Sequence, residues 1–419
     1  ASRQGGGSPF SIRQYGQVEW KDAFSSRQLL VLATLCHSIR NAVQKFKAGR
    51  YDGDWSESLQ AYLAIGMDRI ADRQSTICRW DNGYTKLQGT FTRFALPITW
   101  DYCEGNPFSD TTGNFLSCME WIAEYISHGM EAATNSPVPR ALNHSAMQIG
   151  QGEIDCVVTD PPYYDAIPYS DLMDFFYIWQ RRTLRDLSPT WDGIYDNPLS
   201  PKWDHERQDG ELIDDASRHG NDKSKSKTAY EDGMARVFQA CHQALNPDGR
   251  LVVVFAHKHP DAWETLVAAI IRAGFVVDGS WPIQTEMANR TRGLSSAALA
   301  SSVWLVCKKR PATARPGWDN QVLEDMRQKV SAMLREFWDA GIRGPDFVWA
   351  ATGPAMEAYS KHPVVKKANE PGPMTVSEFL THVRRMVVDF VVGRVLGGEA
   401  AGGSELASAD RLDEQTAYY

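Results

Sequence analysis

An acid, two prolines and two tyrosines follow a short apolar run in the segment VVTDPPYY. The run over residues 154–160 has strand-type composition, which predicts that Asp160 lies at the carboxyl end of a buried strand, where open α/β sheets bind ligands. Pro161 and Pro162 stiffen the turn and remove two N–H donors, leaving carbonyl groups to accept from a ligand. With the Tyr163 ring, these groups can hold a flat molecule bearing an exocyclic amine, such as a base rotated out of a duplex. The alternative is an ordinary turn between a strand and a loop.

Strand and helix patterns alternate after this segment. Apolar runs at 250–257, 275–284 and 301–309 predict strands, and residues 261–273 predict a helix. Continuous Val-rich runs between helices indicate an α/β fold whose sheet is parallel and covered on both faces. The loop between the last two strands has no crossover helix, so we expect these two to be antiparallel neighbours.

Helical patterns dominate both ends of the chain. In the N-terminal part, one predicted helix begins at a capping box of Ser25 and Gln28, a second begins with Asp54 as its N-cap, and a third covers residues 115–133. Two more are expected beyond residue 316, the second beginning at a capping box. The sequence thus predicts a mainly helical segment at 1–135, an α/β core at 136–312 with a long polar loop at 190–229, and an α-helical region at 313–419.

Composition limits the class of protein. Hydrophobic residues make up 43% and charged residues 23% of the 419 residues, as in soluble globular proteins, and no apolar run is long enough to span a membrane. The net charge of −8 argues against a dedicated nucleic-acid binder, although a local basic channel can lie on an acidic protein. Seven widely spaced cysteines without a CxxC motif predict reduced, mostly buried thiols in a cytoplasmic protein, with neither a disulfide framework nor a metal site.

The segment TDPPYY resembles the D-P-P-Y motif of S-adenosylmethionine-dependent amino-methyltransferases that act on DNA. The longer strings VVTDPPYYDAIPYSDLMDFFYIWQRR, TWDYCEGNPFSD, LVVVFAHK and SSVWLVCKKR are similar to bacterial and archaeal adenine-specific DNA methylases that contain a zinc ribbon. This resemblance covers residues 15–400. It implies a partial Rossmann-like methyltransferase sheet with a helical N-terminal insertion and an α-helical C-terminal appendage. It also implies S-adenosyl-L-methionine as cofactor, DNA as partner, and restriction or defence proteins as further partners.

The resemblance implies a role for each residue of the motif. Asp160 accepts hydrogen bonds from the adenine amino group with the help of the Pro161 carbonyl, and Pro162 completes the turn. Tyr163 stacks on the flipped base, a contact worth about 1–3 kcal/mol. Aromatic residues that follow are candidates for the pocket wall, although in a helical segment such residues more often belong to the core. These candidates are Tyr164, Tyr169, Phe175 and Phe176.

Two segments upstream of the motif also match the family. Trp100, Asp101 and Asn106 are candidate neighbours of the active site, and the alternative is a buried loop stabilised by an Asx turn. Ser145 matches the place where the family holds the cofactor adenine, next to the cofactor-facing Asp160; the alternative is an ordinary loop.

Basic residues downstream are candidates for DNA contacts. Arg290 and Arg292 lie in the loop between the last two predicted strands, where they can contact phosphates or belong to a solvated loop. His257 and Lys258 end a predicted strand and can line the site. Three lysines in the polar loop can follow a DNA backbone, but neighbouring acids nearly cancel their charge, which favours a solvated loop. These lysines are Lys223, Lys225 and Lys227.

The family pattern is incomplete in this chain. Upstream of Asp160 there is no glycine-rich turn after a strand and no acid after a second strand, and the zinc-ribbon cysteines are absent. We therefore expect a fragment of a longer protein that binds S-adenosylmethionine weakly on its own. The main prediction is an N6-adenine DNA methyltransferase of DNA modification or phage defence. Alternatives are N4-cytosine or RNA amine methylation and a non-catalytic DNA-recognition piece; a dinucleotide-dependent oxidoreductase is disfavoured because no GxGxxG turn exists.

Overall fold

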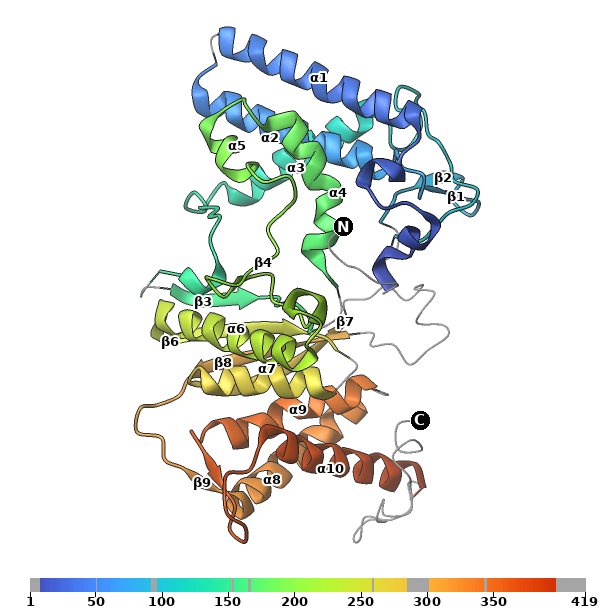
Figure 1. Cartoon of the computed structure of the whole chain (residues 1–419). Coiled ribbons are helices and arrows are strands. Elements are labelled where there is room, and N and C mark those ends of the chain that lie inside the picture. The colour runs from blue at the N-terminus through green and yellow to red at the C-terminus, as the bar shows by residue number, and fades with distance from the viewer. Residues whose placement is uncertain are drawn as a thin grey trace. The chain divides into compact units, whose positions relative to one another are not determined.

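The computed structural model has an α/β fold and divides into two compact units, each of which is described by itself (Figure 1). The helical unit comprises residues 1–143 and 167–211, and the sheet unit comprises residues 144–166 and 212–419. These boundaries differ from the three predicted regions because segment 167–211 packs with the N-terminal helices. The structure describes residues 8–49, 51–91, 96–150, 152, 154–164, 167–257, 260–284, 301–342 and 345–396.

The helical unit is built around α1, α2 and α4, which contact one another and lie side by side in Figure 1. Leu32, Met67, Ile70 and Phe175 are fully buried between them. The helices of this unit are η1 (Ser8–Tyr15), η2 (Trp20–Ala23), α1 (Ser26–Ala48), α2 (Gly53–Asp72), α3 (Phe115–Ala133), α4 (Tyr169–Leu184) and α5 (Pro189–Ile194). Its antiparallel hairpins are β1 (Arg79–Asp81) with β2 (Lys86–Gln88), and β4 (Trp203–Asp204) with β5 (Asp209–Gly210).

The N-termini of α1 and α2 test two predicted caps. The capping box of α1 is confirmed. The backbone N–H of Gln28 donates to Ser25 Oγ across 3.2 Å, and the backbone N–H of Ser25 donates to Gln28 Oε1 across 2.8 Å. The prediction of Asp54 as N-cap is wrong by two residues. Asp52 caps α2, accepting from the Trp55 N–H across 2.9 Å, and Asp54 lies within the first turn.

The sheet unit contains a mixed four-stranded sheet and the remaining helices. Its strands are β3 (Ile154–Thr159), β6 (Leu245–Phe255), β7 (Phe275–Gln284), β8 (Ser301–Lys309), β9 (Gly317–Trp318) and β10 (Val365–Lys366). Its helices are η3 (Ala146–Gln148), η4 (Ala216–His219), α6 (Lys223–Ala244), α7 (Pro260–Arg272), α8 (Asp319–Asp339), α9 (Pro345–Ser360) and α10 (Val376–Leu396).

The strand order of this sheet is β3-β6-β8-β7. β3 and β6 are parallel, and β8 is antiparallel to both β6 and β7, so the predicted antiparallel pairing of the last two strands is confirmed. The consecutive residues Phe275, Val276 and Val277 are all buried, so both faces of β7 are covered there. Val158 in β3 is 62% exposed, so the predicted cover of both faces fails at this edge strand.

Helices α6 and α7 lie side by side against the sheet, and α9 packs on β7 (Figure 1). At the α9 contact, Ser280 Oγ of β7 donates to the Ala350 carbonyl across 3.2 Å. Gly353 faces the same serine, and a Cβ there would lie 1.9 Å from Ser280 Oγ. The close approach of helix and strand therefore requires glycine at this position.

The C-terminal helices include both predicted ones and one more. The capping box of α10 is confirmed, with the Thr375 N–H 2.8 Å from a Glu378 carboxylate oxygen and the Glu378 N–H 3.2 Å from Thr375 Oγ1. Helix α9 is not expected from the sequence, because it carries Pro354 in its interior, a residue that normally ends a helical pattern.

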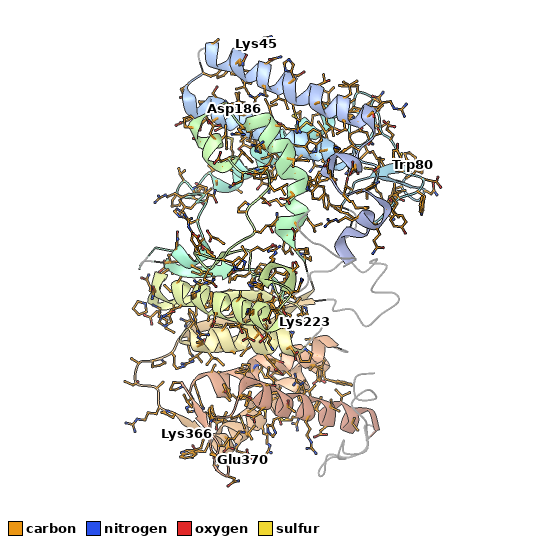
Figure 2. All side chains as sticks on the ribbon, viewed as in Figure 1. Lys45, Trp80, Asp186, Lys223, Lys366 and Glu370 are labelled. Atoms are coloured by element: carbon orange, nitrogen blue, oxygen red, sulfur yellow. The ribbon has the colours of Figure 1, made fainter. Side chains whose placement is uncertain are left out.

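The segment predicted as a long polar loop, residues 190–229, contains regular structure. It holds most of α5, the β4–β5 hairpin, η4 and the start of α6, where Figure 2 labels Lys223. Lys225 lies 3.8 Å from Asp222 and Lys227 lies 3.9 Å from Glu231. The Asp222 side chain also caps α6, accepting from two backbone N–H groups. Two of the three lysines thus pair with acids at α6, and all three lie on this helix instead of in a solvated loop.

Five of the seven cysteines are buried, as predicted, while Cys156 is exposed on β3. Within the described part of the chain, no helix combines the length and the apolar character that crossing a bilayer requires.

Candidate functional site

Asp160 directly follows β3, at the sheet edge where the parallel strands β3 and β6 both end. The residue is exposed, and no described residue forms a hydrogen bond or ion pair with its carboxylate. Pro161 is buried, and no described residue donates to its carbonyl oxygen. Neighbouring residues thus bring to the carboxyl end of the sheet two acceptors to which no described residue donates.

The next carbonyl, that of Pro162, is engaged. The Tyr230 hydroxyl of α6 donates to it across 2.8 Å, and the Tyr164 N–H lies 2.9 Å from the same oxygen. The Tyr164 N–H also lies 3.3 Å from Tyr230 Oη. Because Tyr230 is only 1% exposed, α6 holds this turn in one conformation from inside the sheet unit.

Tyr163 is half-buried and packs against the end of β6. Its ring centroid lies 5.2 Å from that of Phe255, and the ring planes meet at 71°. Phe255 is fully buried and contacts Trp263 of α7, whose indole N–H donates to the His257 carbonyl across 2.9 Å. His257 follows β6, as predicted, and is 7% exposed.

Tyr164 turns toward the interior of the sheet unit. Its φ of +54° is the left-handed conformation, which is uncommon for a residue other than glycine. Its ring packs edge-on against Tyr230 and His257, at centroid distances of 5.3 and 6.1 Å. Burial, followed by the charge and hydrogen bond of Asp214, raises the pKa of the Tyr164 hydroxyl above its usual range. These contacts hold the turn, and the place of Tyr164 in a pocket wall stays a prediction.

Asp214 holds this turn through both its backbone and its side chain. Its N–H donates to the Tyr164 carbonyl across 3.1 Å, and its carboxylate accepts hydrogen bonds from Tyr164 and from Ser226 of α6. Sequence reasoning missed Asp214 and Tyr230. Neither stands in a motif, and they lie 50 and 66 residues from Tyr164 along the chain, so no local pattern marks them.

Three further aromatic candidates belong to the helical unit. Phe175 has no exposed surface and packs against Phe24 and Phe91 at centroid distances of 5.4 and 5.2 Å, which contradicts its predicted place in a pocket wall. Phe176 packs against the same cluster. The helical segment thus buries these rings in a core, the alternative named above. Tyr169, the first residue of α4, is 53% exposed.

The candidate neighbours of the active site also lie in the helical unit. Trp100 is 77% exposed, with its ring centroid 5.5 Å from that of Tyr15, and Asp101 is exposed. Asn106 Oδ1 accepts from the Phe108 N–H across 3.0 Å, so the Asx turn of the alternative interpretation is present, on an exposed loop.

Ser145, the candidate for holding the cofactor adenine, lies within the described residues. Ser145 caps η3, with its Oγ accepting from the Met147 N–H across 3.2 Å. In the described residues no strand precedes β3 in its sheet, so a glycine-rich turn beside β3 has no counterpart. Arg290, Arg292 and Lys258 lie outside the described residues.

A carboxylate and a neighbouring carbonyl are both acceptors, and together such groups can accept the two hydrogens of an amine. Among the described side chains, no three acids, histidines or cysteines gather as metal ligands.

No protein-family model, no curated protein and no solved structure matches this chain.

Proposed function

We propose that this chain provides the base-binding part of an S-adenosylmethionine-dependent methyltransferase that methylates the N6 amine of adenine in DNA. The observation that carries the proposal is the Asp160 carboxylate, exposed and without a partner among the described residues, beside the Pro161 carbonyl. An exposed carboxylate is hydrated, and the hydrogens of an amine can replace that water.

Asp160 and the Pro161 carbonyl accept the two hydrogens of the amine in this proposal. Both hydrogen bonds draw electron density toward the nitrogen and orient its lone pair. Tyr163, fixed against Phe255, offers its ring to one face of the flipped base. S-adenosylmethionine supplies the methyl group when it is bound.

The fold supports this assignment in a coarse way. Parallel β3 and β6 end together at the proposed site, which is where open α/β sheets bind their ligands. We propose that the sheet is part of a Rossmann-like methyltransferase sheet and that the enzyme acts in the cytoplasm.

Nucleoside mass spectrometry on DNA from methylation-free cells that express the full gene tests the proposal. The matched variants are Asp160→Ala and Asp155→Ala, which remove an exposed acid at opposite ends of the same strand. We expect N6-methyladenine with the wild-type protein and with Asp155→Ala, and none with Asp160→Ala. A wild-type level of methylation with Asp160→Ala would exclude the role of the motif.

Other products of the same experiment would replace the proposal by a specific alternative. N4-methylcytosine, or methylated bases in RNA alone, would support the same contacts to an amine but would identify a different substrate. The absence of any methylated base would favour a DNA-recognition module.

A further inference from the structure

Tyr163 is the central residue of a tight turn. The Tyr164 N–H donates to the Pro162 carbonyl across 2.9 Å, and this bond between residues two positions apart closes a three-residue turn around Tyr163. A turn of this kind fixes the backbone of its central residue and thereby the direction in which that side chain leaves the chain. The orientation of the Tyr163 ring therefore depends on the residue that follows it.

Tyr164 has a backbone conformation that a tyrosine does not favour. Its φ of +54° is in the left-handed region, where the Cβ atom of any residue other than glycine crowds the following carbonyl oxygen. Such conformations persist only where the surrounding structure holds them, and they are found most often at functional sites. The turn therefore needs contacts that keep Tyr164 from relaxing to a negative φ.

Asp214 supplies such contacts from a distant segment of the sheet unit. Its backbone N–H donates to the Tyr164 carbonyl across 3.1 Å, and its carboxylate accepts a hydrogen bond from the Tyr164 hydroxyl. Ser226 of α6, which has no exposed surface, donates to the same carboxylate and keeps it in place. Asp214 thus holds Tyr164 both by its backbone and by the end of its side chain.

A series of ring contacts also joins Tyr164 to Tyr163. The Tyr164 ring packs edge-on against His257, with the centroids 6.1 Å apart. His257 stacks on Phe255 at 6.4 Å, and Phe255 contacts the Tyr163 ring at 5.2 Å. A displacement of Tyr164 is therefore transmitted to Tyr163 through these rings as well as through the backbone.

We propose that Tyr164 and Asp214 are positioning residues for methyl transfer, which act by fixing the Tyr163 ring in the orientation that stacks on the flipped base. This inference rests on the proposed function, in which Tyr163 offers its ring to the base, and it adds two residues that act through that ring. Small displacements of a positioned group lower the rate of the chemical step strongly. We therefore expect the two residues to affect kcat and not KM for DNA.

A fluorine label on Tyr163 tests the positioning without measuring activity. 3-Fluorotyrosine is placed at position 163 of the full-length protein, and the ¹⁹F spectrum is recorded in the absence of DNA. Tyr164→Phe removes the hydroxyl that donates to Asp214 and keeps the ring. Asp214→Asn removes the charge and keeps an oxygen that can accept from Ser226. In both variants the ¹⁹F resonance should shift or broaden, because the Tyr163 ring is no longer held in one orientation.

The rates of methyl transfer by the same proteins test the consequence. Each substitution should lower kcat about tenfold and leave KM for DNA within about twofold of the wild-type value. Because both substitutions affect the same hydrogen bond, the double variant should be no more than about twofold slower than either single variant.

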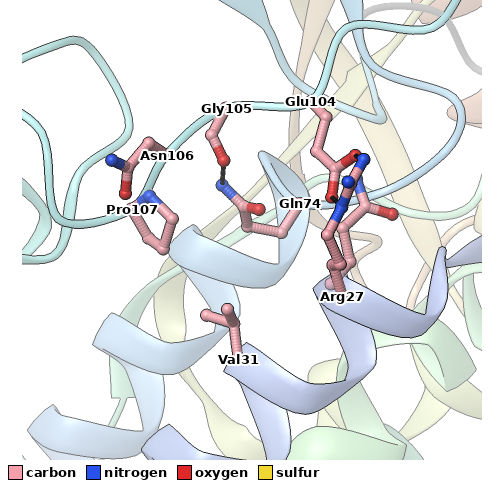
Figure 3. A pocket seen from close by; sticks show the side chains of 8 residues that line it. Arg27, Val31, Gln74, Glu104, Gly105, Asn106 and Pro107 are labelled. Carbon is pink, nitrogen blue, oxygen red and sulfur yellow. Dashed lines mark hydrogen bonds and ion pairs between the residues drawn. The ribbon is translucent and has the colours of Figure 1, made fainter.

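Two control variants make the same chemical changes in the helical unit. Tyr177→Phe removes a buried hydroxyl that donates to the Asn197 carbonyl across 2.9 Å. Glu104→Gln changes a carboxylate that lines a pocket of about 380 Å³ and accepts from Arg27 across 2.8 Å (Figure 3). Both controls should keep the wild-type ¹⁹F spectrum of Tyr163 and the wild-type kcat.

An unchanged ¹⁹F spectrum in Tyr164→Phe and Asp214→Asn would overturn the proposal, whatever the rates. So would a loss confined to KM for DNA, or a double variant slower by about a hundredfold, since the two residues would then act independently. A changed spectrum with no methyl transfer by the wild-type protein would instead overturn the proposed function, with the Tyr163 ring still shown to depend on Tyr164 and Asp214. The two failures are therefore distinguishable.

Discussion

The Tyr230 hydroxyl donates a hydrogen bond to the Pro162 carbonyl oxygen across 2.8 Å, joining residues 68 positions apart in the chain. The bond ties the middle of α6 to the turn that presents Asp160. Because the Pro162 carbonyl is occupied, the turn is fixed, while the preceding carbonyl of Pro161 receives no donor from any described residue. The acceptor geometry of the proposed site therefore depends on a residue that does not belong to the motif.

Tyr230→Phe removes this hydrogen bond and keeps the ring. We expect a loss of about 1 kcal/mol in the free energy of unfolding, and a kcat for methyl transfer about tenfold lower with little change in KM for DNA. The control is Tyr359→Phe, which removes a similar bond, from a buried hydroxyl to the Met374 carbonyl across 2.6 Å, elsewhere in the sheet unit. Equal rates for the two variants would show that the Tyr230 bond serves stability alone.

The stability of the helical unit should depend on the protonation of Asp68. Burial raises the pKa of this carboxyl to about 7, although Gln180 donates a hydrogen bond to it, and Asp68 Oδ1 is buried without a partner among the described residues. The folded state then holds a proton that the unfolded state releases at a pH of about 4, so stability falls as pH rises from about 4 to 7. Chemical denaturation at several pH values should show a loss of roughly 1 kcal/mol per pH unit that Asp68→Asn lacks.

The exposed acid Asp54, on the same helix, provides the control for that experiment. Asp54→Asn should keep the wild-type pH dependence. Parallel curves for Asp68→Asn and wild type would contradict the assignment of the titrating group.

Lys202 stabilises a fully buried acid. Its Nζ lies 2.8 Å from Asp174 Oδ1 and 2.7 Å from Ser200 Oγ, and the Asp174 side chain has 0% exposure. Lys202→Met leaves the carboxylate buried without its cation and should cost about 3–5 kcal/mol of unfolding free energy. Adding Asp174→Asn should restore part of that loss.

An exposed ion pair is the comparison for Lys202. Arg207 and Asp204 lie 3.7 Å apart with 85% and 47% exposed side chains, so Arg207→Gln should cost less than about 1 kcal/mol. Thermal denaturation of the four proteins checks the order. A Lys202→Met protein as stable as the Arg207→Gln protein would mean that Asp174 is solvated in solution.

Gly353→Ala should loosen the contact between α9 and β7. The new Cβ would lie 1.9 Å from Ser280 Oγ and 2.1 Å from Ser280 Cβ, so the helix must shift, at a cost of about 1–3 kcal/mol. Ser280→Gly should recover part of that cost in the double variant. Gly129→Ala in α3 meets nothing within 4 Å and should stabilise slightly through helix propensity. Equal melting temperatures for Gly353→Ala and Gly129→Ala would disprove the close approach.

Local patterns predicted much of the secondary structure. The capping boxes at Ser25 and Thr375 are present because each depends on two residues three positions apart. The cap of α2 was misplaced because Asp52 and Asp54 both suit the position, and the chain uses the one whose oxygen reaches the Trp55 N–H. The α9 helix was missed because its interior proline argues against a helix locally, while packing on β7 stabilises it.

The sequence by itself determined the strand before Asp160, the stiff turn after it and the chemical types available there, because strand formation and proline geometry depend on neighbouring residues. Only the tertiary structure decided which acceptors stay free. Tyr230 and Asp214 form hydrogen bonds with the backbone around Tyr164. Phe175 is buried in a core although it follows the motif closely. Such choices depend on contacts between distant segments, whose free energies belong to the whole fold and leave no mark on a short stretch of sequence.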